Sequence, residues 1–227
     1  MSYFEKNLAI ITEEEQKILS EKKVFVAGCG GLGGSIAELL CRSGFSDLTF
    51  ADGDVFEPTN MNRQILCTEK TLGHSKAQAA AERARLISPE IKVETVSGFI
   101  TQDNVRDLIH GKDLVIDALD SINARLMLED ACAAEDIYLV HGAVSSWMIQ
   151  TAVCPPGAGL LHSLYKGGSD SQKSAGGTGV AVFVCASFEV TEAIKLLTGR
   201  KDSLSGQVLF FDLYEKESQI VDFRMPE

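Results

Sequence analysis

The stretch "VFVAGCGGLGGSIAELLCRSGF" at residues 24–45 constrains the fold more than any other part of the chain. An apolar run there passes through a glycine cluster into a helical pattern, and Gly28, Gly30 and Gly33 have the spacing G-x-G-x-x-G. Glycines at these places let the backbone turn tightly and approach phosphates near a helix N-terminus. The stretch therefore predicts a nucleotide-binding βαβ unit, although it does not separate a dinucleotide cofactor from ATP.

Strand and helix patterns alternate along most of the chain. A short amphipathic helix at 11–23 comes first, with Thr12 as the expected N-cap. Strands are predicted at 24–27, 48–52, 93–98, 114–118 and 138–144, with helices between them, notably at 76–87 and 124–136. This alternation implies right-handed crossovers and a largely parallel sheet with helices on both faces.

The pattern changes after Trp147. A strand at 147–154, a long helix at 180–199 and two strands at 207–216 and 218–225 follow. Very few residues separate the last two strands, so we expect them to pair as a hairpin. The predicted fold is α/β and Rossmann-like, with antiparallel C-terminal strands extending the parallel sheet.

No repeat or linker divides the 227 residues, so we interpret the chain as one domain. It comprises an N-terminal arm and helix at 1–22, a nucleotide-binding half at 23–145 and a second half at 146–227. The Gly/Ser-rich segment "KGGSDSQKSAGGTG" at 166–179 is expected to be a mobile loop. Its length predicts either a disordered insertion or a segment that covers a substrate.

Acidic and basic residues follow the second predicted strand. Asp52 is the better candidate for accepting hydrogen bonds from ribose hydroxyls, whereas Asp54 can equally be a turn residue beside Gly53. The polar residues beyond them are Asn60, Asn62, Arg63, Gln64 and Lys76. Basic residues at this spacing can hold a triphosphate, although each one alone is usually a solvated charge.

Two carboxylates, Asp117 and Asp120, stand at the end of the fourth predicted strand in "DLVIDALDSINAR". Ligands of α/β proteins bind at this edge of the sheet, and a carboxylate opposite a triphosphate is well placed to hold magnesium. The alternative is that Asp120 or Ser121 caps the helix that follows.

Composition narrows the partners. The formal net charge of −11 and the pI near 4.9 argue against a nucleic-acid or anionic-membrane partner. The N-terminus lacks the features of a secretory signal and no apolar run reaches membrane-spanning length, so we expect a cytoplasmic protein. The six cysteines occur singly, without a C-x-x-C pair, and we expect reduced, mostly buried thiols.

Several motifs, taken in order, resemble the MoeB/ThiF/HesA family, the bacterial relatives of ubiquitin-activating enzymes. They are "GCGGLGG", "ADGDVFEPTNMNRQ", "LGHSKA", "DALDSINAR", "FEVTEAIKLLTG" and "VLFFDLY". The order D-x-D, N-x-N-R-Q, G-x-x-K and D-x-x-D is far more specific than the glycine motif. The resemblance implies a homodimeric adenylyltransferase that uses ATP and Mg²⁺ to activate the C-terminal carboxylate of a small ubiquitin-fold sulfur carrier ending in Gly-Gly. The product would serve molybdopterin, tungstopterin or thiamine synthesis, and residues 146–227 would bind the carrier.

The resemblance also implies roles for single residues. Asp52 would bind ribose, Asp120 would hold magnesium, and Arg63, Lys76 and Asp120 would be catalytic. The expected ATP-binding set is Gly28, Gly30, Gly31, Gly33, Asp52, Asp54, Asn60, Asn62, Arg63, Gln64 and Lys76. In the family an N-terminal arginine reaches the partner subunit's site; Lys6 stands at that place here and lacks the planar fork of arginine.

The chain departs from the family at two places. Many members bind structural zinc through two C-x-x-C pairs, but Leu161 and Leu164 stand where the first pair would be, so we expect no zinc. Some members carry a reactive cysteine in the crossover loop, and "SDSQKSAGGTG" has none, which favours plain adenylation. The alternatives are adenylation of a tRNA base or a peptide terminus, an NAD(P) oxidoreductase and a non-catalytic scaffold.

Overall fold

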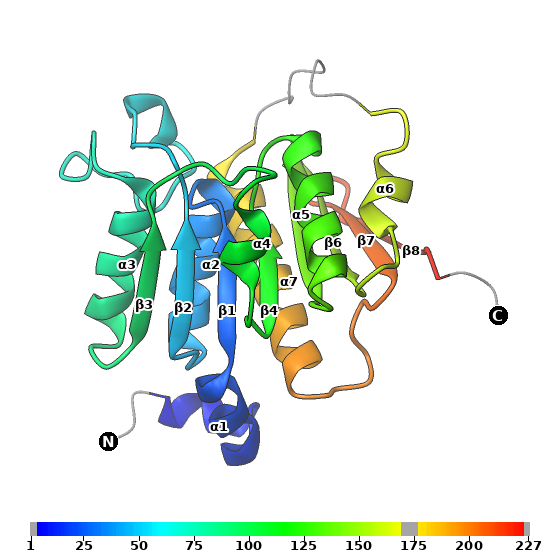
Figure 1. Ribbon diagram of the computed structural model, residues 1–227, viewed down its shortest axis with the longest axis horizontal. Helices are drawn as coiled ribbons and strands as arrows, with labels where there is room; N and C mark the ends of the chain where they lie inside the picture. Colours follow the sequence, from blue (N-terminus) through cyan, green and yellow to red (C-terminus); the bar gives the residue numbers. More distant parts are fainter. Residues whose placement is uncertain (1–3, 169–176, 225–227) are drawn as a thin grey trace.

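The structure is a computed structural model that describes residues 4–168 and 177–224. Its centre is an eight-stranded sheet with the order β3-β2-β1-β4-β5-β6-β7-β8 (Figure 1). The strands are β1 (Lys23–Ala27), β2 (Asp47–Ala51), β3 (Lys92–Val96), β4 (Leu114–Asp117), β5 (Leu139–Ser145), β6 (Met148–Cys154), β7 (Gln207–Asp212) and β8 (Glu217–Asp222). Strands β1 to β5 pair in parallel, and β5 to β8 pair antiparallel. This confirms the predicted α/β fold and its C-terminal hairpin.

Helices cover both faces of the sheet, as the alternation predicted. The α-helices are α1 (Glu13–Glu21), α2 (Gly31–Arg42), α3 (Lys76–Ile87), α4 (Val105–Ile109), α5 (Ile122–Ala134), α6 (Leu160–Leu164) and α7 (Gly179–Leu197). One core cluster joins α2, α3 and α7 to strand residues such as Val24 and Val26, and another joins α4, α5 and α6 to Phe25 and Val115. Because side chains alternate along a strand, β1 supplies both cores.

Local signals explain most helix boundaries. Thr12 caps α1 as expected: its hydroxyl accepts from the Glu15 amide at 3.2 Å, and its own amide donates to the Glu15 carboxylate at 2.8 Å. Helix α4 lies between the predicted strands at 93–98 and 114–118, where a helix was expected, whereas the short elements η1 (Glu5–Ala9), η2 (Pro58–Asn60) and α6 were not expected from the sequence. Helix α6 depends on a distant partner, because the buried Glu129 carboxylate accepts from the amides of Leu161 at 2.8 Å and His162 at 3.1 Å. No periodic pattern reports such a contact.

The expected mobile loop at 166–179 falls largely outside the described residues, which omit 169–176. Helix α7 already begins at Gly179, with Thr178 as its N-cap. Among the helices of the described chain, none has both the length and the apolar character needed to cross a membrane.

Candidate active site

The glycine loop joins β1 to α2 and packs tightly against the ends of two neighbouring strands. The Gly28 amide donates to the carbonyl of Ala51, the last residue of β2, at 2.8 Å. Gly28 has a φ of +94°, and a Cβ there would lie 2.7 Å from the Ala118 carbonyl oxygen beyond β4. A Cβ on Gly33 would overlap the Gly28 carbonyl. Only glycine suits these two positions, so the loop can bring its backbone close to a ligand.

Asp52 ties this loop to the turn after β2. Its carboxylate accepts from the Cys29 amide at 2.7 Å and from the Asp54 amide at 2.8 Å. Each carboxylate oxygen has a second lone pair, so these bonds orient Asp52 without using up its capacity to accept from hydroxyls. The structure thus puts Asp52 beside the glycine loop, where the ribose hypothesis needs it.

Lys76 begins α3 and faces the same turn. Its ammonium nitrogen lies 3.0 Å from Asp54 Oδ2, and its amide donates to the Asp54 carbonyl at 3.1 Å. The Lys76 side chain is only 10% exposed, whereas that of Asp54 is 56% exposed. Asp54 is therefore more than a turn residue, because it holds a nearly buried lysine at the edge of the site.

The segment 60–64 lies on the other side of the glycine loop. A Cβ on Gly30 would point at Gln64 Nε2 from 3.5 Å, and one on Gly31 at the Arg63 carbonyl oxygen from 3.6 Å. Arg63 donates to Asn62 Oδ1 at 2.8 Å and to the Thr59 carbonyl at 3.2 Å, which fixes its guanidinium within its own turn. Gln64 Oε1 is buried and has no hydrogen-bond partner among the described residues, so an unused acceptor lies beside the loop.

Asn60 has a different position from its neighbours. It is buried, and its Oδ1 accepts from the Glu57 amide at 3.0 Å, which holds the η2 turn together. Its side chain supports the segment that carries Asn62 and Arg63. A capping role of this kind is visible in retrospect in the "EPTN" signature that precedes the basic residues.

Asp120 is exposed in the turn between β4 and α5. Ser121 is the N-cap of α5, since its hydroxyl accepts from the Ala124 amide at 3.1 Å. Of the two caps considered from the sequence, Ser121 is the one used. Gly28 packs against Ala118, so this turn begins directly beside the glycine loop.

Magnesium fits this arrangement only as an ion coordinated jointly by the protein and a bound nucleotide. In the described chain no group of three or more histidine, cysteine or acidic side chains could hold a metal ion. Mg²⁺ is commonly bound by one or two protein carboxylates together with substrate phosphates and water. Asp120 thus suits an ion that enters with a nucleotide, and not a metal site built by the protein alone.

Phe99 was missed by the sequence reasoning. Its ring packs on Gly53, where a Cβ would lie 2.7 Å from ring carbon Cδ1, yet the side chain is 67% exposed. An exposed aromatic residue just beyond a strand of the parallel sheet is a signal for a ligand-stacking surface.

Comparison with known proteins decides among the hypotheses. The family model described as ThiF family matches residues 4–227. The chain belongs to the ThiF family. This confirms the MoeB/ThiF/HesA resemblance.

Two curated relatives illustrate the similarity of this ThiF-family protein. It is 32% identical over 216 residues to SAMP-activating enzyme E1 of Haloferax volcanii, covering 93% of this chain and 80% of the relative. It is 35% identical over 208 residues to sulfur carrier protein ThiS adenylyltransferase of Bacillus subtilis, covering 89% of this chain and 61% of the relative. The protein is therefore an enzyme, an adenylyltransferase.

A solved structure has the same fold. The crystal structure of E. coli MccB with ATP aligns with a TM-score of 0.86 at 19% identity, covering 99% of this chain and 72% of that one. At this identity the likeness concerns the fold alone, and it confirms the Rossmann-like architecture.

Lys6 lies away from the site of its own ThiF-family chain. It is exposed on η1, whose neighbouring residue Asn7 donates to the Arg42 carbonyl at 2.8 Å. Arg42 ends α2, and the glycine loop begins it, so the 12 residues of this helix separate the two by about 18 Å. Figure 1 accordingly draws the N-terminal helices at the end of the sheet opposite the loops that follow β2 and β4.

All six cysteines of the enzyme are buried. Burial raises the pKa of the thiols of Cys29, Cys154 and Cys185 well above the ordinary value. A thiol must be exposed and ionised to act as a nucleophile. Cys29 therefore fills space under the glycine loop and does not supply chemistry there.

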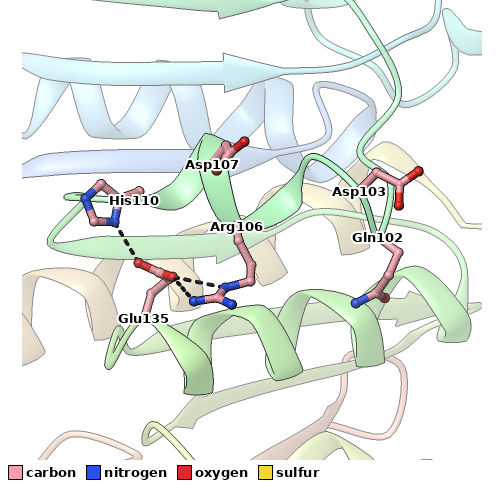
Figure 2. Close-up of a pocket in the computed structure, with 6 residues that line it drawn as sticks. All are labelled: Gln102, Asp103, Arg106, Asp107, His110 and Glu135. Atoms are coloured by element: carbon pink, nitrogen blue, oxygen red, sulfur yellow. Dashed lines mark hydrogen bonds and ion pairs between the residues drawn. The ribbon is translucent and has the colours of Figure 1, made fainter.

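A surface pocket between α4 and α5 contains none of the predicted site residues. It is lined by Gln102, Asp103, Arg106, Asp107, His110 and Glu135 (Figure 2). Glu135 accepts from His110 at 2.7 Å and from Arg106 at 2.7 and 3.1 Å, and these hydrogen bonds lower its pKa. Both Arg106 and His110 are thus engaged by the protein's own Glu135 carboxylate.

Proposed function

We propose that this ThiF-family enzyme uses ATP and Mg²⁺ to adenylate the C-terminal glycine carboxylate of a small ubiquitin-fold sulfur-carrier protein. One observation carries the proposal: the glycine loop contacts, within one site, the turn of Asp52, the segment of Arg63 and the strand end that leads to Asp120. The names of the relatives from Bacillus subtilis and Salmonella typhimurium, a sulfur carrier protein ThiS adenylyltransferase and a molybdopterin-synthase adenylyltransferase, support this substrate class.

The chain's residues divide the work of holding ATP. The backbone at Gly28, Gly30, Gly31 and Gly33 cradles the phosphates, with the N-terminus of α2 favouring their negative charge. Asp52 accepts from the ribose hydroxyls, and the exposed ring of Phe99 covers the base. Arg63 and Lys76 hold the triphosphate, with Asn62 and Gln64 as further donors, while Asn60 and Asp54 keep these side chains in place.

The reaction needs no nucleophilic side chain. A carboxylate oxygen of the carrier's terminal glycine attacks the α-phosphorus in line. The bond from the α-phosphorus to the bridging oxygen breaks, pyrophosphate leaves, and an acyl-adenylate remains. Lys76 and Arg63 stabilise the charge that develops on the leaving pyrophosphate, so catalysis consists of positioning and electrostatics. Magnesium, when bound, neutralises phosphate charge, and Asp120 is the residue that would hold it.

The proposal includes a homodimer. Lys6 is remote from its own site, so it can act only in the site of a second copy. Residues 146–227, which supply β6, β7, β8 and α7, would carry the carrier-binding surface of each copy. The sulfur donor and the pathway, molybdopterin, tungstopterin or thiamine, depend on which carrier is used.

The test is carrier-dependent exchange of labelled pyrophosphate into ATP. Purified protein with Mg²⁺ and a Gly-Gly carrier should catalyse exchange, and Asp120→Ala should lower the rate by at least about a thousandfold. Asp107→Ala, at an exposed position on α4, is the matched control and should exchange like the wild type. Absence of exchange with every carrier of its genome would contradict the proposal. If a peptide or a tRNA supported exchange instead, the proposed adenylation would stand and the proposed carrier substrate would be wrong.

A further inference from the structure

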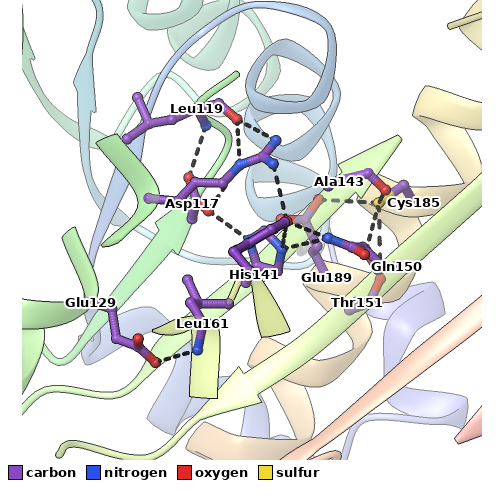
Figure 3. A network of polar contacts seen from close by, with 12 residues as sticks. Asp117, Leu119, Glu129, His141, Ala143, Gln150, Thr151, Leu161, Cys185 and Glu189 are labelled. Carbon is purple, nitrogen blue, oxygen red and sulfur yellow. Dashed lines mark hydrogen bonds and ion pairs between the residues drawn. The ribbon is translucent and has the colours of Figure 1, made fainter. Parts of the chain in front are cut away.

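A closed ring of hydrogen bonds adjoins the Asp120 turn; Asp117 and His141 in it are fully buried, and Leu119, Arg125 and Tyr165 are partly buried. Asp117, at the end of β4, accepts from His141 Nδ1 at 2.6 Å (Figure 3). His141 Nε2 lies 2.9 Å from the Tyr165 hydroxyl. Arg125 donates from Nη1 to that hydroxyl at 3.0 Å, and from Nε and Nη2 to the Leu119 carbonyl at 3.1 and 2.9 Å. The Leu119 amide closes the ring by donating to Asp117 Oδ1 at 2.9 Å.

The protons of this ring follow from its members. Because the Asp117 carboxylate accepts at Oδ2, His141 carries its proton on Nδ1 and offers Nε2 as an acceptor. Burial lowers the pKa of His141, so the imidazole is neutral. Burial also raises the pKa of Tyr165 to about 12, so its hydroxyl keeps the proton that it donates to His141. Each link of the ring therefore has one donor and one acceptor, and the Gln150 Nε2 group adds a further donor to the Tyr165 hydroxyl and lies 3.2 Å from His141 Nε2.

The ring holds both backbone polar groups of a single residue. Leu119 directly precedes Asp120, and its amide and carbonyl are bonded to Asp117 and Arg125 respectively. Arg125 comes from α5, His141 from β5 and Tyr165 from the C-cap of α6, so residues from three separate elements hold the two peptide groups on either side of the Leu119 Cα. Asp120 itself is exposed.

We propose that Arg125 is a positioning residue that, through this ring, fixes the Leu119–Asp120 peptide and so directs the Asp120 carboxylate toward the nucleotide. The role of Asp120 rests on the function proposed above. The guanidinium fork is essential to this arrangement, because two of its N–H groups reach one carbonyl while a third reaches Tyr165. A lysine keeps the charge beside Asp117, whose Oδ2 is 3.8 Å from Arg125 Nε, but cannot make all three bonds.

The decisive variant is Arg125→Lys, which keeps the buried charge balanced and should fold. Its matched control is Arg83→Lys on α3, where the arginine also makes several hydrogen bonds, to Glu38. We expect the amide proton of Leu119, which is bonded to Asp117, to exchange with solvent about tenfold faster in Arg125→Lys, with no change in Arg83→Lys. Unchanged amide exchange would overturn the proposal. This measurement needs no substrate, so it tests the ring even if the proposed activity is absent.

Kinetics separate positioning from a merely structural role. In carrier-dependent pyrophosphate exchange, kcat of Arg125→Lys should fall by about a hundredfold while KM for ATP changes less than about twofold. Tyr165→Phe removes one link and should lower kcat by a smaller factor, whereas the control Arg83→Lys should leave kcat unchanged. A raised KM at unchanged kcat, or full activity of Arg125→Lys, would contradict the proposal. A wild type without exchange would instead overturn the proposed function.

Discussion

The two sides of the candidate site are built in different ways. On the β2 side, Asp52, Asp54 and Lys76 bind one another or the glycine loop directly, and Asp54 is half exposed. On the β4 side, Asp120 is exposed, and the preceding Leu119 is bonded by a ring of Asp117, His141, Tyr165 and Arg125 in which Asp117 and His141 are fully buried. On the β2 side a nearly buried lysine pairs with a half-exposed carboxylate, whereas on the β4 side the carboxylate of the framework, Asp117, is fully buried. Stability and catalysis should therefore respond differently on the two sides.

The largest expected effect on stability is that of a substitution on the β4 side. Asp117→Ala removes the anion of the ring and leaves Arg125, whose side chain is only 12% exposed, without a counter-charge. We expect the free energy of unfolding to fall by about 3–5 kcal/mol, because loss of one partner of a buried pair leaves an uncompensated charge. Urea unfolding of the variant and the wild type measures this. A loss below about 1 kcal/mol would show that the ring is not a structural unit.

On the β2 side, a substitution should lower catalytic activity more than it lowers stability. Lys76→Ala removes the cation that we propose to bind the triphosphate, and we expect kcat/KM for ATP to fall by about 10²–10³-fold. Lys112→Ala is a matched control, since Lys112 pairs with Glu94 on the β3 edge. A decrease of less than about tenfold in Lys76→Ala would mean that Lys76 serves only to hold Asp54.

The buried carboxyl group of Glu189 should make the stability of the protein depend on pH. Burial and, next, the nearby Asp117 raise the pKa of Glu189 well above its usual value, against the opposing effects of Arg125 and Cys185. Above the unfolded pKa the folded state binds more protons than the unfolded state, so stability decreases as pH rises toward the folded pKa. Glu189→Gln removes this penalty, and its stability relative to wild type should increase with pH by up to about 1.4 kcal/mol per unit. Thermal unfolding from pH 5 to 9 measures it; a difference independent of pH would contradict the account.

The smallest expected effect on stability is that of a substitution at Asp54. Asp54→Asn removes the charge that faces Lys76, but the pair is partly solvated. We expect the free energy of unfolding to fall by no more than about 1 kcal/mol. A loss as large as that of Asp117→Ala would erase the distinction between the two sides.

The features that could be predicted from the sequence are those that depend on residues close together in the chain. The parallel core, the C-terminal hairpin and the Asp52 and Lys76 positions depend on short motifs and strand ends, so local pattern sufficed. Helix α6 was missed because its N-terminal amides are bound by Glu129, 32 and 33 residues away along the chain.

The ring was missed for a similar reason. Arg125 was visible in the motif "DALDSINAR", but its partner Tyr165 lies 40 residues away and belongs to an element that the sequence did not reveal. The sequence did contain one indication of the ring, because Asp117 and His141 are polar residues within otherwise apolar strands. A buried polar residue in a parallel sheet needs a hydrogen-bond partner. Which partner it finds depends on tertiary packing.

The central claim is that this enzyme transfers the adenylyl group to a carrier carboxylate. Its most direct test is a single turnover with ATP labelled at the α-phosphorus or, separately, at the γ-phosphorus, followed by rapid separation of the carrier. We predict that the α-label appears on the carrier, in an amount equal to the pyrophosphate released, and that the γ-label does not. Label on the carrier from the γ-phosphorus, or release of pyrophosphate without labelled carrier, would contradict the account.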